Sequence, residues 1–111
     1  MGFQNLSEDI VLVELSREPQ MRDELKTITD IVHDRGDCDV IIDFSNVDII
    51  TSSSLSNLLR LRQLLLDCGR RLVFCSVPAF TKSTFRVTGL DGIFELADDK
   101  DAASAILQCA N

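Results

Sequence analysis

The chain has 111 residues, 45% of them hydrophobic, with 18 acidic and 11 basic side chains and a formal net charge of −7. This length and apolar content suit one soluble domain with one core, spanning residues 1–111. The charge disfavours nucleic acid and anionic membranes as partners, and the sequence lacks a membrane span or a signal-peptide pattern, so we expect a cytoplasmic protein.

A strand and then a helix are predicted in the first third of the chain. The segment from Leu6 to Leu15 contains a β-branched apolar run at residues 10–13, which is short enough for a strand, and a further short strand is possible around Phe3. From Met21 the apolar residues recur at helical spacing, and the helix should end near Gly36. Its apolar positions are Met21, Leu25, Ile28 and Val32.

The middle of the chain predicts two buried strands around a long helix. Residues 40–44 form a continuous apolar run, which is typical of a central strand buried on both faces. The hydroxyl residues Thr51 to Ser54 then open a helix of about four turns that Gly69 stops. A second buried-strand run follows at residues 72–77.

The last third predicts helix, strand and helix. Pro78 suits the first turn of a helix that stops at the Thr88 to Leu90 turn, and residues 93–96 form a short strand. Aspartates within residues 98–101 cap a terminal helix. This alternation predicts an α/β fold in which about four helices pack on a mixed β-sheet of four to five strands.

Two leucines of the long helix are predicted to be exposed. At 100° per residue, Leu61 and Leu64 point away from an apolar stripe formed by Leu55, Leu58, Leu59, Leu65 and Leu66. Adjacent exposed leucines suggest an apolar contact patch for a partner or a second copy, unless a neighbouring helix or loop covers them. Arg62 falls within the stripe, so its stem should pack while its guanidinium pairs or escapes.

The sequence offers no catalytic centre. It has no Gly-x-Ser-x-Gly elbow or glycine-rich phosphate loop, and its one histidine, His33, lies on a different helix from Ser53. Asp43 and Asp48 flank a turn, but solvated turn aspartates are commoner than metal ligands, and we assign no catalytic residue, metal or cofactor.

The four cysteines contain no Cys-x-x-Cys pair. This pattern indicates reduced, mostly buried thiols, because metal-binding and redox cysteines usually occur in such pairs. Cys109, near the end of the chain, is the one most expected to be reachable.

The chain resembles the STAS family of bacterial anti-sigma-factor antagonists in four features taken together. These are the segment from Val40 to Leu55, the leucine-rich helix that follows, Pro78 after a buried strand, and the Thr88 to Leu90 turn. In that family a strand ends in Asp-Leu-Ser-x-Val, two apolar residues follow, and Asp-Ser-Ser-Gly-Leu opens a helix. The resemblance covers nearly the whole chain in order and spacing. It implies a STAS domain active in signal transduction and transcription regulation.

The resemblance also implies a partner and a switch. The partner would be an anti-sigma factor that is a serine kinase of the histidine-kinase-like ATPase type, and its target serine falls on Ser53. A phosphate at a helix N-terminus meets free N–H groups, while its charge disfavours a surface built for neutral hydroxyls. Binding would thus be lost without unfolding.

Four positions depart from the family motifs. The family aspartate falls on Thr51 and the glycine on Ser54, while the glycine and aspartate of an earlier Leu-x-Gly-Glu-Leu-Asp loop fall on Arg17 and Gln20. Glu18 matches that loop. Because acidic groups beside the acceptor serine are lost, Thr51 or Ser54 are alternative acceptors, as is Ser52.

Two hypotheses follow for the hydroxyl cluster. Thr51, Ser52, Ser53 and Ser54 are either helix caps alone or also a partner-contact surface, and both roles can coexist if one residue caps while its neighbours face outward. The first hypothesis is a phosphorylation-switched antagonist. The second is a constitutive STAS scaffold module, never phosphorylated, that uses the same helix. A homodimer is compatible with either.

Overall fold

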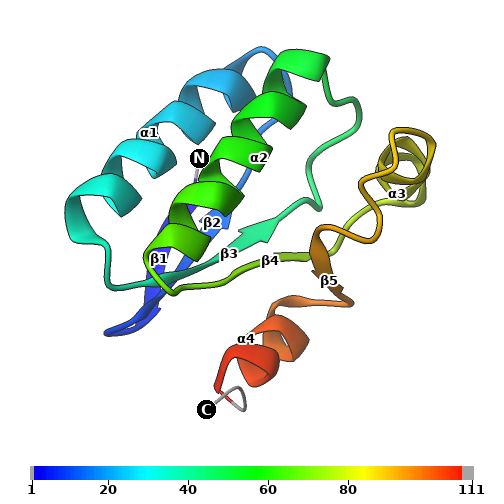
Figure 1. Ribbon diagram of the computed structural model, residues 1–111. Helices are drawn as coiled ribbons and strands as arrows, with labels where there is room; N and C mark the ends of the chain where they lie inside the picture. The colour runs from blue at the N-terminus through cyan, green and yellow to red at the C-terminus, as the bar shows by residue number, and fades with distance from the viewer. Residues whose placement is uncertain (1, 109–111) are drawn as a thin grey trace.

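The computed structural model describes residues 2–108, and within this range the chain forms a five-stranded sheet in the order β1-β2-β3-β4-β5 (Figure 1). The strands are β1 (Gly2–Ser7), β2 (Ile10–Glu14), β3 (Asp39–Asp43), β4 (Leu72–Cys75) and β5 (Glu95–Ala97). The helices are α1 (Gln20–Arg35), α2 (Ser52–Asp67), α3 (Ala79–Val87) and α4 (Lys100–Gln108). Across residues 2–108 each helix falls short of the length and apolar content that crossing a bilayer requires. The predicted α/β fold with a mixed sheet is confirmed.

The sheet is parallel except at one edge. Strand β1 pairs antiparallel with β2, whereas β2, β3, β4 and β5 pair in parallel. Each parallel connection needs a helix that runs back across the sheet, so α1 and α2 both begin at the carboxyl edge of the strands. The central strand β3 pairs with β2 and β4, and its residues 40–43 are buried, as its continuous apolar run predicts.

Helices cover both faces of the sheet, because alternate residues of a strand point to opposite faces. The larger core joins one set of strand residues to buried positions of α1, α2 and α3. The smaller core joins the other set to α4. Its members are Ile10, Leu12, Ile41, Val73 and Cys75 from the strands and Ala103 and Leu107 from α4.

The observed ends of several elements follow from local contacts. Gly36 adopts a left-handed conformation with φ 68° and its N–H donates to the carbonyl of Val32 at 2.8 Å, which ends α1 where expected. Strand β5 begins at Glu95, later than predicted, because the N–H groups of Ile93 and Phe94 donate to the carbonyl of Leu90 in a turn.

The last two helices begin in different ways. Pro78 is the N-cap of α3 in an extended conformation rather than a member of its first turn. Asp99 accepts a hydrogen bond from the N–H of Ala102 at 2.8 Å, which is the predicted aspartate cap of α4.

The buried face of α2 differs from the predicted stripe. Leu61 is 0% exposed and Leu64 is half-buried against the larger core, whereas Leu66 is 47% exposed. The expectation that Leu61 and Leu64 are exposed is therefore wrong, and they form no apolar contact patch. The buried row is Ser54, Leu58, Leu61 and Leu65, so it includes a polar residue that a pattern drawn from leucines alone leaves out. Arg62 is half-buried and donates from Nε to the carbonyl of Ile93 at 3.2 Å, as its position in the sequence suggests.

The described cysteines divide by exposure. Cys38 and Cys75 are buried, as predicted, and Cys68 is exposed, while Cys109 lies outside the described residues. Burial raises the pKa of the Cys75 thiol to about 11, and it also raises the pKa of Cys38. Both buried thiols therefore stay protonated near neutral pH.

Truncation of two leucines of α2 should separate the observed packing from the predicted stripe. Leu61→Ala leaves a cavity in the core and should lower the free energy of unfolding by about 2–5 kcal/mol. Leu66→Ala, on the exposed side of the same helix, should cost about 0.5 kcal/mol or less. Urea denaturation of both variants measures the difference, and equal costs would contradict this packing of α2.

Alkylation should follow the burial of the thiols. In native protein at pH 8, iodoacetamide should modify Cys68 readily and leave the buried Cys38 and Cys75 nearly untouched. Burial raises the pKa of both thiols, and at the value of about 11 for Cys75 only about 0.1% of that thiol is thiolate at pH 8. Peptide mass spectrometry measures the extent at each site. The three sites should react alike in urea, and rapid native modification of Cys75 would contradict its burial.

Candidate functional site

The carboxyl edge of the sheet brings together two segments that are far apart in the sequence. The loop after β2, which contains Glu18, leads into α1, and the loop after β3 leads through Thr51 into α2. Because both helices begin at this edge, the two loops lie side by side, and α1 and α2 run next to each other along the sheet (Figure 1). The predicted hydroxyl cluster therefore faces residues of the α1 start.

Thr51 is the cap of α2. Its backbone is extended, with φ −81° and ψ 161°, and its hydroxyl oxygen accepts a hydrogen bond from the N–H of Ser54 at 3.2 Å. The same hydroxyl donates to Oε1 of Glu18 at 3.3 Å. The predicted capping role is confirmed for this residue, and the cap also ties the start of α2 to the loop before α1.

Ser54 faces the interior, contrary to the expectation that it belongs to an exposed contact surface. It is 0% exposed, and its hydroxyl donates a hydrogen bond to Oε1 of Glu18. A buried hydroxyl must find an acceptor, and Glu18 provides one here. Ser54 is therefore neither a partner contact nor an accessible phosphate acceptor. The sequence alone does not predict this role of Glu18, and the only signal for it is the match of Glu18 to the family loop.

Ser52 and Ser53 face outward at the first turn of α2, and Thr51 is exposed as well. Among residues 2–108 the Ser53 hydroxyl has no hydrogen-bond partner, so it is available to a second molecule. Ser53 lines two adjoining hollows together with Arg22. The prediction that one hydroxyl caps the helix while its neighbours face outward holds for Thr51 with Ser52 and Ser53.

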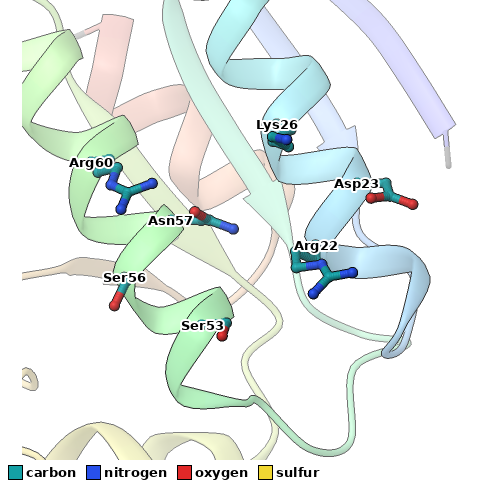
Figure 2. A pocket seen from close by; sticks show the side chains of 7 residues that line it. All are labelled: Arg22, Asp23, Lys26, Ser53, Ser56, Asn57 and Arg60. Carbon is teal, nitrogen blue, oxygen red and sulfur yellow. The ribbon is translucent and has the colours of Figure 1, made fainter.

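One of these hollows is a groove between α1 and α2 with a volume of about 420 Å³. We call it the α1–α2 groove, and it is lined by Arg22, Asp23, Lys26, Ser53, Ser56, Asn57 and Arg60. Figure 2 shows Arg22 and Lys26 on α1, Ser53 and Asn57 on the side of α2 that faces them, and Asp23 pointing away from α2. The groove is thus polar and carries three cationic side chains.

The other titratable groups singled out in the sequence do not join this site. His33 lies in the last turn of α1, at the opposite end of the parallel helix pair from Ser53. Asp43 accepts a hydrogen bond from the N–H of Ser45 at 2.8 Å, and Asp48 pairs with Arg17 at 3.7 Å. Within residues 2–108 there is no group of three or more His, Cys, Asp or Glu side chains placed to hold a metal ion.

Comparison with known proteins gives matches of family and fold. The STAS domain family model matches residues 9–103. The protein named "Putative anti-sigma factor antagonist BtrV" from Bordetella bronchiseptica (strain ATCC BAA-588 / NCTC 13252 / RB50) is 29% identical over 77 residues, which cover 69% of this chain and 66% of BtrV. The match therefore spans slightly less than two thirds of that relative.

Two solved structures illustrate the fold. An anti-sigma-factor antagonist (STAS) domain protein from Planctomyces limnophilus aligns with a TM-score of 0.82 and 17% identity over 96% of this chain and 97% of that one. SpoIIAA, a Bacillus cell fate determinant in its phosphorylated form, aligns with a TM-score of 0.71 and 14% identity over 95% of this chain and 97% of that one. At such identities the likeness establishes the fold alone.

Removal of the Glu18 carboxylate should reveal the energetic coupling between Glu18 and Ser54. Glu18→Ala leaves the buried Ser54 hydroxyl without its acceptor and should lower the free energy of unfolding by about 1–3 kcal/mol. In a Ser54→Ala background the same change should cost less, because no buried hydroxyl remains to be satisfied. Urea denaturation of the two single variants and the double variant measures this coupling. Strictly additive costs would show that the two side chains act independently.

Proposed function

Because the chain belongs to the STAS domain family, we propose that it is an anti-sigma-factor antagonist that binds a kinase-type anti-sigma factor through the exposed start of α2. The contact surface consists of Thr51, Ser52 and Ser53, and Ser53 is the residue that the partner phosphorylates. Phosphorylation ends the association, so the domain acts as a reversible switch and not as an enzyme.

The observation that carries this proposal is the division of the four hydroxyl residues. Ser54 is buried on Glu18 and Thr51 is occupied as the helix cap, whereas Ser53 is exposed, free of hydrogen bonds to residues 2–108 and located at the α1–α2 groove. A kinase must reach a hydroxyl from solvent, and Ser53 satisfies this requirement. Ser52 is also exposed but does not line the groove.

The proposed phosphoryl transfer requires little of this chain except an accessible Ser53 hydroxyl. The Ser53 oxygen attacks the γ-phosphorus of ATP bound to the partner, the bond from that phosphorus to the bridging oxygen breaks, ADP leaves, and the hydroxyl proton passes to a base of the kinase. The product carries a phosphate of about −1.5 to −2 charge at the first turn of α2, where free N–H groups and the positive helix end tolerate it. The domain stays folded while the surface seen by the partner changes.

Two further observations favour a contact surface at this place. Ile49, two residues before Thr51 in the loop that leads into α2, is an apolar residue that is 60% exposed. The similar BtrV carries the name of an anti-sigma factor antagonist, and SpoIIAA has been solved in a phosphorylated form. The name of BtrV and the phosphorylated form of SpoIIAA support a regulatory switch of this type in the present chain.

Substitution at Ser53 should separate binding from folding. Ser53→Asp should leave the melting temperature nearly unchanged, because the charge sits at a helix N-terminus, and should weaken partner binding by tenfold or more. Ser53→Ala should retain binding and resist phosphorylation. A pull-down from the native lysate with each variant, followed by mass spectrometry and phosphopeptide analysis, measures both effects.

A matched control and the opposing outcome complete this experiment. Asn5→Asp adds the same charge on β1, where Asn5 pairs with Val11 at the amino edge of the sheet, and it should not affect binding. The antagonist role requires that a histidine-kinase-like ATPase is retained by wild type and lost with Ser53→Asp. If all variants retain the same proteins and wild type carries no phosphate, the chain is instead a constitutive scaffold module.

A further inference from the structure

We infer that Arg22, Lys26 and Arg60 form a clamp in the α1–α2 groove that binds the phosphate on Ser53. This inference rests on the proposed phosphorylation and adds the regulation of the same site: the chain itself holds its phosphate through side chains of two neighbouring helices. We call these three residues the cationic clamp.

The three cations line the same groove as Ser53. Arg22 lines both hollows that Ser53 lines, and Figure 2 shows it at the start of α1, across the groove from the first turn of α2. Lys26 follows Arg22 by four residues and Arg60 follows Ser53 by seven, so each lies on the groove side of its own helix. Side chains in a helix lean toward its N-terminus, which directs Arg60 toward Ser53.

The charges of the groove are uncompensated. Among residues 2–108 no ion pair is formed by Arg22, Lys26 or Arg60, whereas Arg17, Arg35, Arg70 and Arg71 each pair with a carboxylate. Arg62, Lys82, Arg86 and Lys100 also form no ion pair within this range, and the three clamp residues differ from them in lining one groove together. The unpaired cations therefore leave room for an anion from another source.

Two carboxylates also line the hollows next to Ser53, and among residues 2–108 neither forms an ion pair with the clamp. Asp23 lines the groove but points away from α2, and Glu18 is occupied by the hydroxyls of Thr51 and Ser54. The charged groups that line a hollow with Ser53 are thus three cations, Arg22, Lys26 and Arg60, and two carboxylates, Asp23 and Glu18. Hydrogen bonds from neutral hydroxyls do not cancel a carboxylate charge, so the cations exceed the carboxylates by one.

A phosphate on Ser53 supplies negative charge and hydrogen-bond acceptors to the cations of this groove. It brings about −1.5 to −2 charge and three acceptor oxygens, and guanidinium groups bind such oxygens through two parallel N–H donors. The excess of cations over carboxylates around Ser53 favours the dianion, so the second phosphate pKa, ordinarily about 6, should fall. Occupation of the clamp also removes a positive patch from the surface beside Ser53.

Titration of the phosphate tests the clamp directly. Phosphoserine is installed at position 53 of the full chain during translation, and the second ionisation is followed by ³¹P NMR. The midpoint should lie at least about half a pH unit lower in the otherwise unchanged protein than in the Arg22→Gln/Arg60→Gln variant, since one unit charge about 5 Å away in water shifts a pKa by that order.

Two controls separate the clamp from net charge and from misfolding. Lys100→Gln removes a cation from α4, on the opposite face of the sheet, and should leave the midpoint unchanged. Arg22→Lys/Arg60→Lys keeps the charges and should retain most of the lowering. The lowering should also shrink in 1 M salt, where screening reaches about 3 Å.

The clamp is overturned if the midpoint is the same in the unchanged and the Arg-to-Gln proteins. This outcome is distinct from failure of the proposed function. Because the phosphate is installed without a kinase, the titration reads the clamp whatever the partner is. Absence of phosphate on Ser53 in protein from its own cells would instead reject the switch and leave the titration result standing.

Discussion

Parallel pairing of β2, β3 and β4 is the constraint on which the rest of the molecule depends. Because these strands run in one direction, the helices between them must return in the other, and the starts of α1 and α2 meet at the same edge of the sheet. The buried apolar run of β3 enforces this arrangement, since both of its faces must be covered. Every feature of the candidate site follows from that shared edge.

Glu18 divides the hydroxyl cluster into structural and accessible members. Its carboxylate accepts from Thr51 and Ser54, which fixes the first turn of α2 against the loop that precedes α1. Ser53, one residue earlier than Ser54, is left on the outer side of the helix. The 100° rotation per residue is enough to separate a buried serine from an exposed one. Adjacent residues of the same type therefore have different roles.

The charge of this protein is arranged unevenly. The chain is acidic as a whole, yet Arg22, Lys26 and Arg60 meet in one groove with no carboxylate paired to them among residues 2–108. Average net charge describes the long-range field, while recognition depends on a few groups within several ångströms. A helix N-terminus alone tolerates a phosphate, whereas cations on two helices can hold it in one position.

The sequence by itself determined the elements and their order, because these depend on local patterns. The apolar run at 40–44 predicted the central strand, and the hydroxyls from Thr51 predicted the start of α2. The family motifs also pointed to Ser53. These predictions needed only neighbouring residues, whose periodicity and capping chemistry are readable along the chain.

Tertiary structure alone decided which side of α2 is buried and what surrounds Ser53. The buried row of α2 contains Leu61 and the polar Ser54, whose contact with Glu18 spans 36 residues, and a pattern of leucines alone does not predict either position. The groove likewise requires that Arg22 be brought beside Ser53 by the packing of α1 on α2. Local periodicity carries no information on contacts between distant segments, because these form only when the sheet closes and sets the helices side by side.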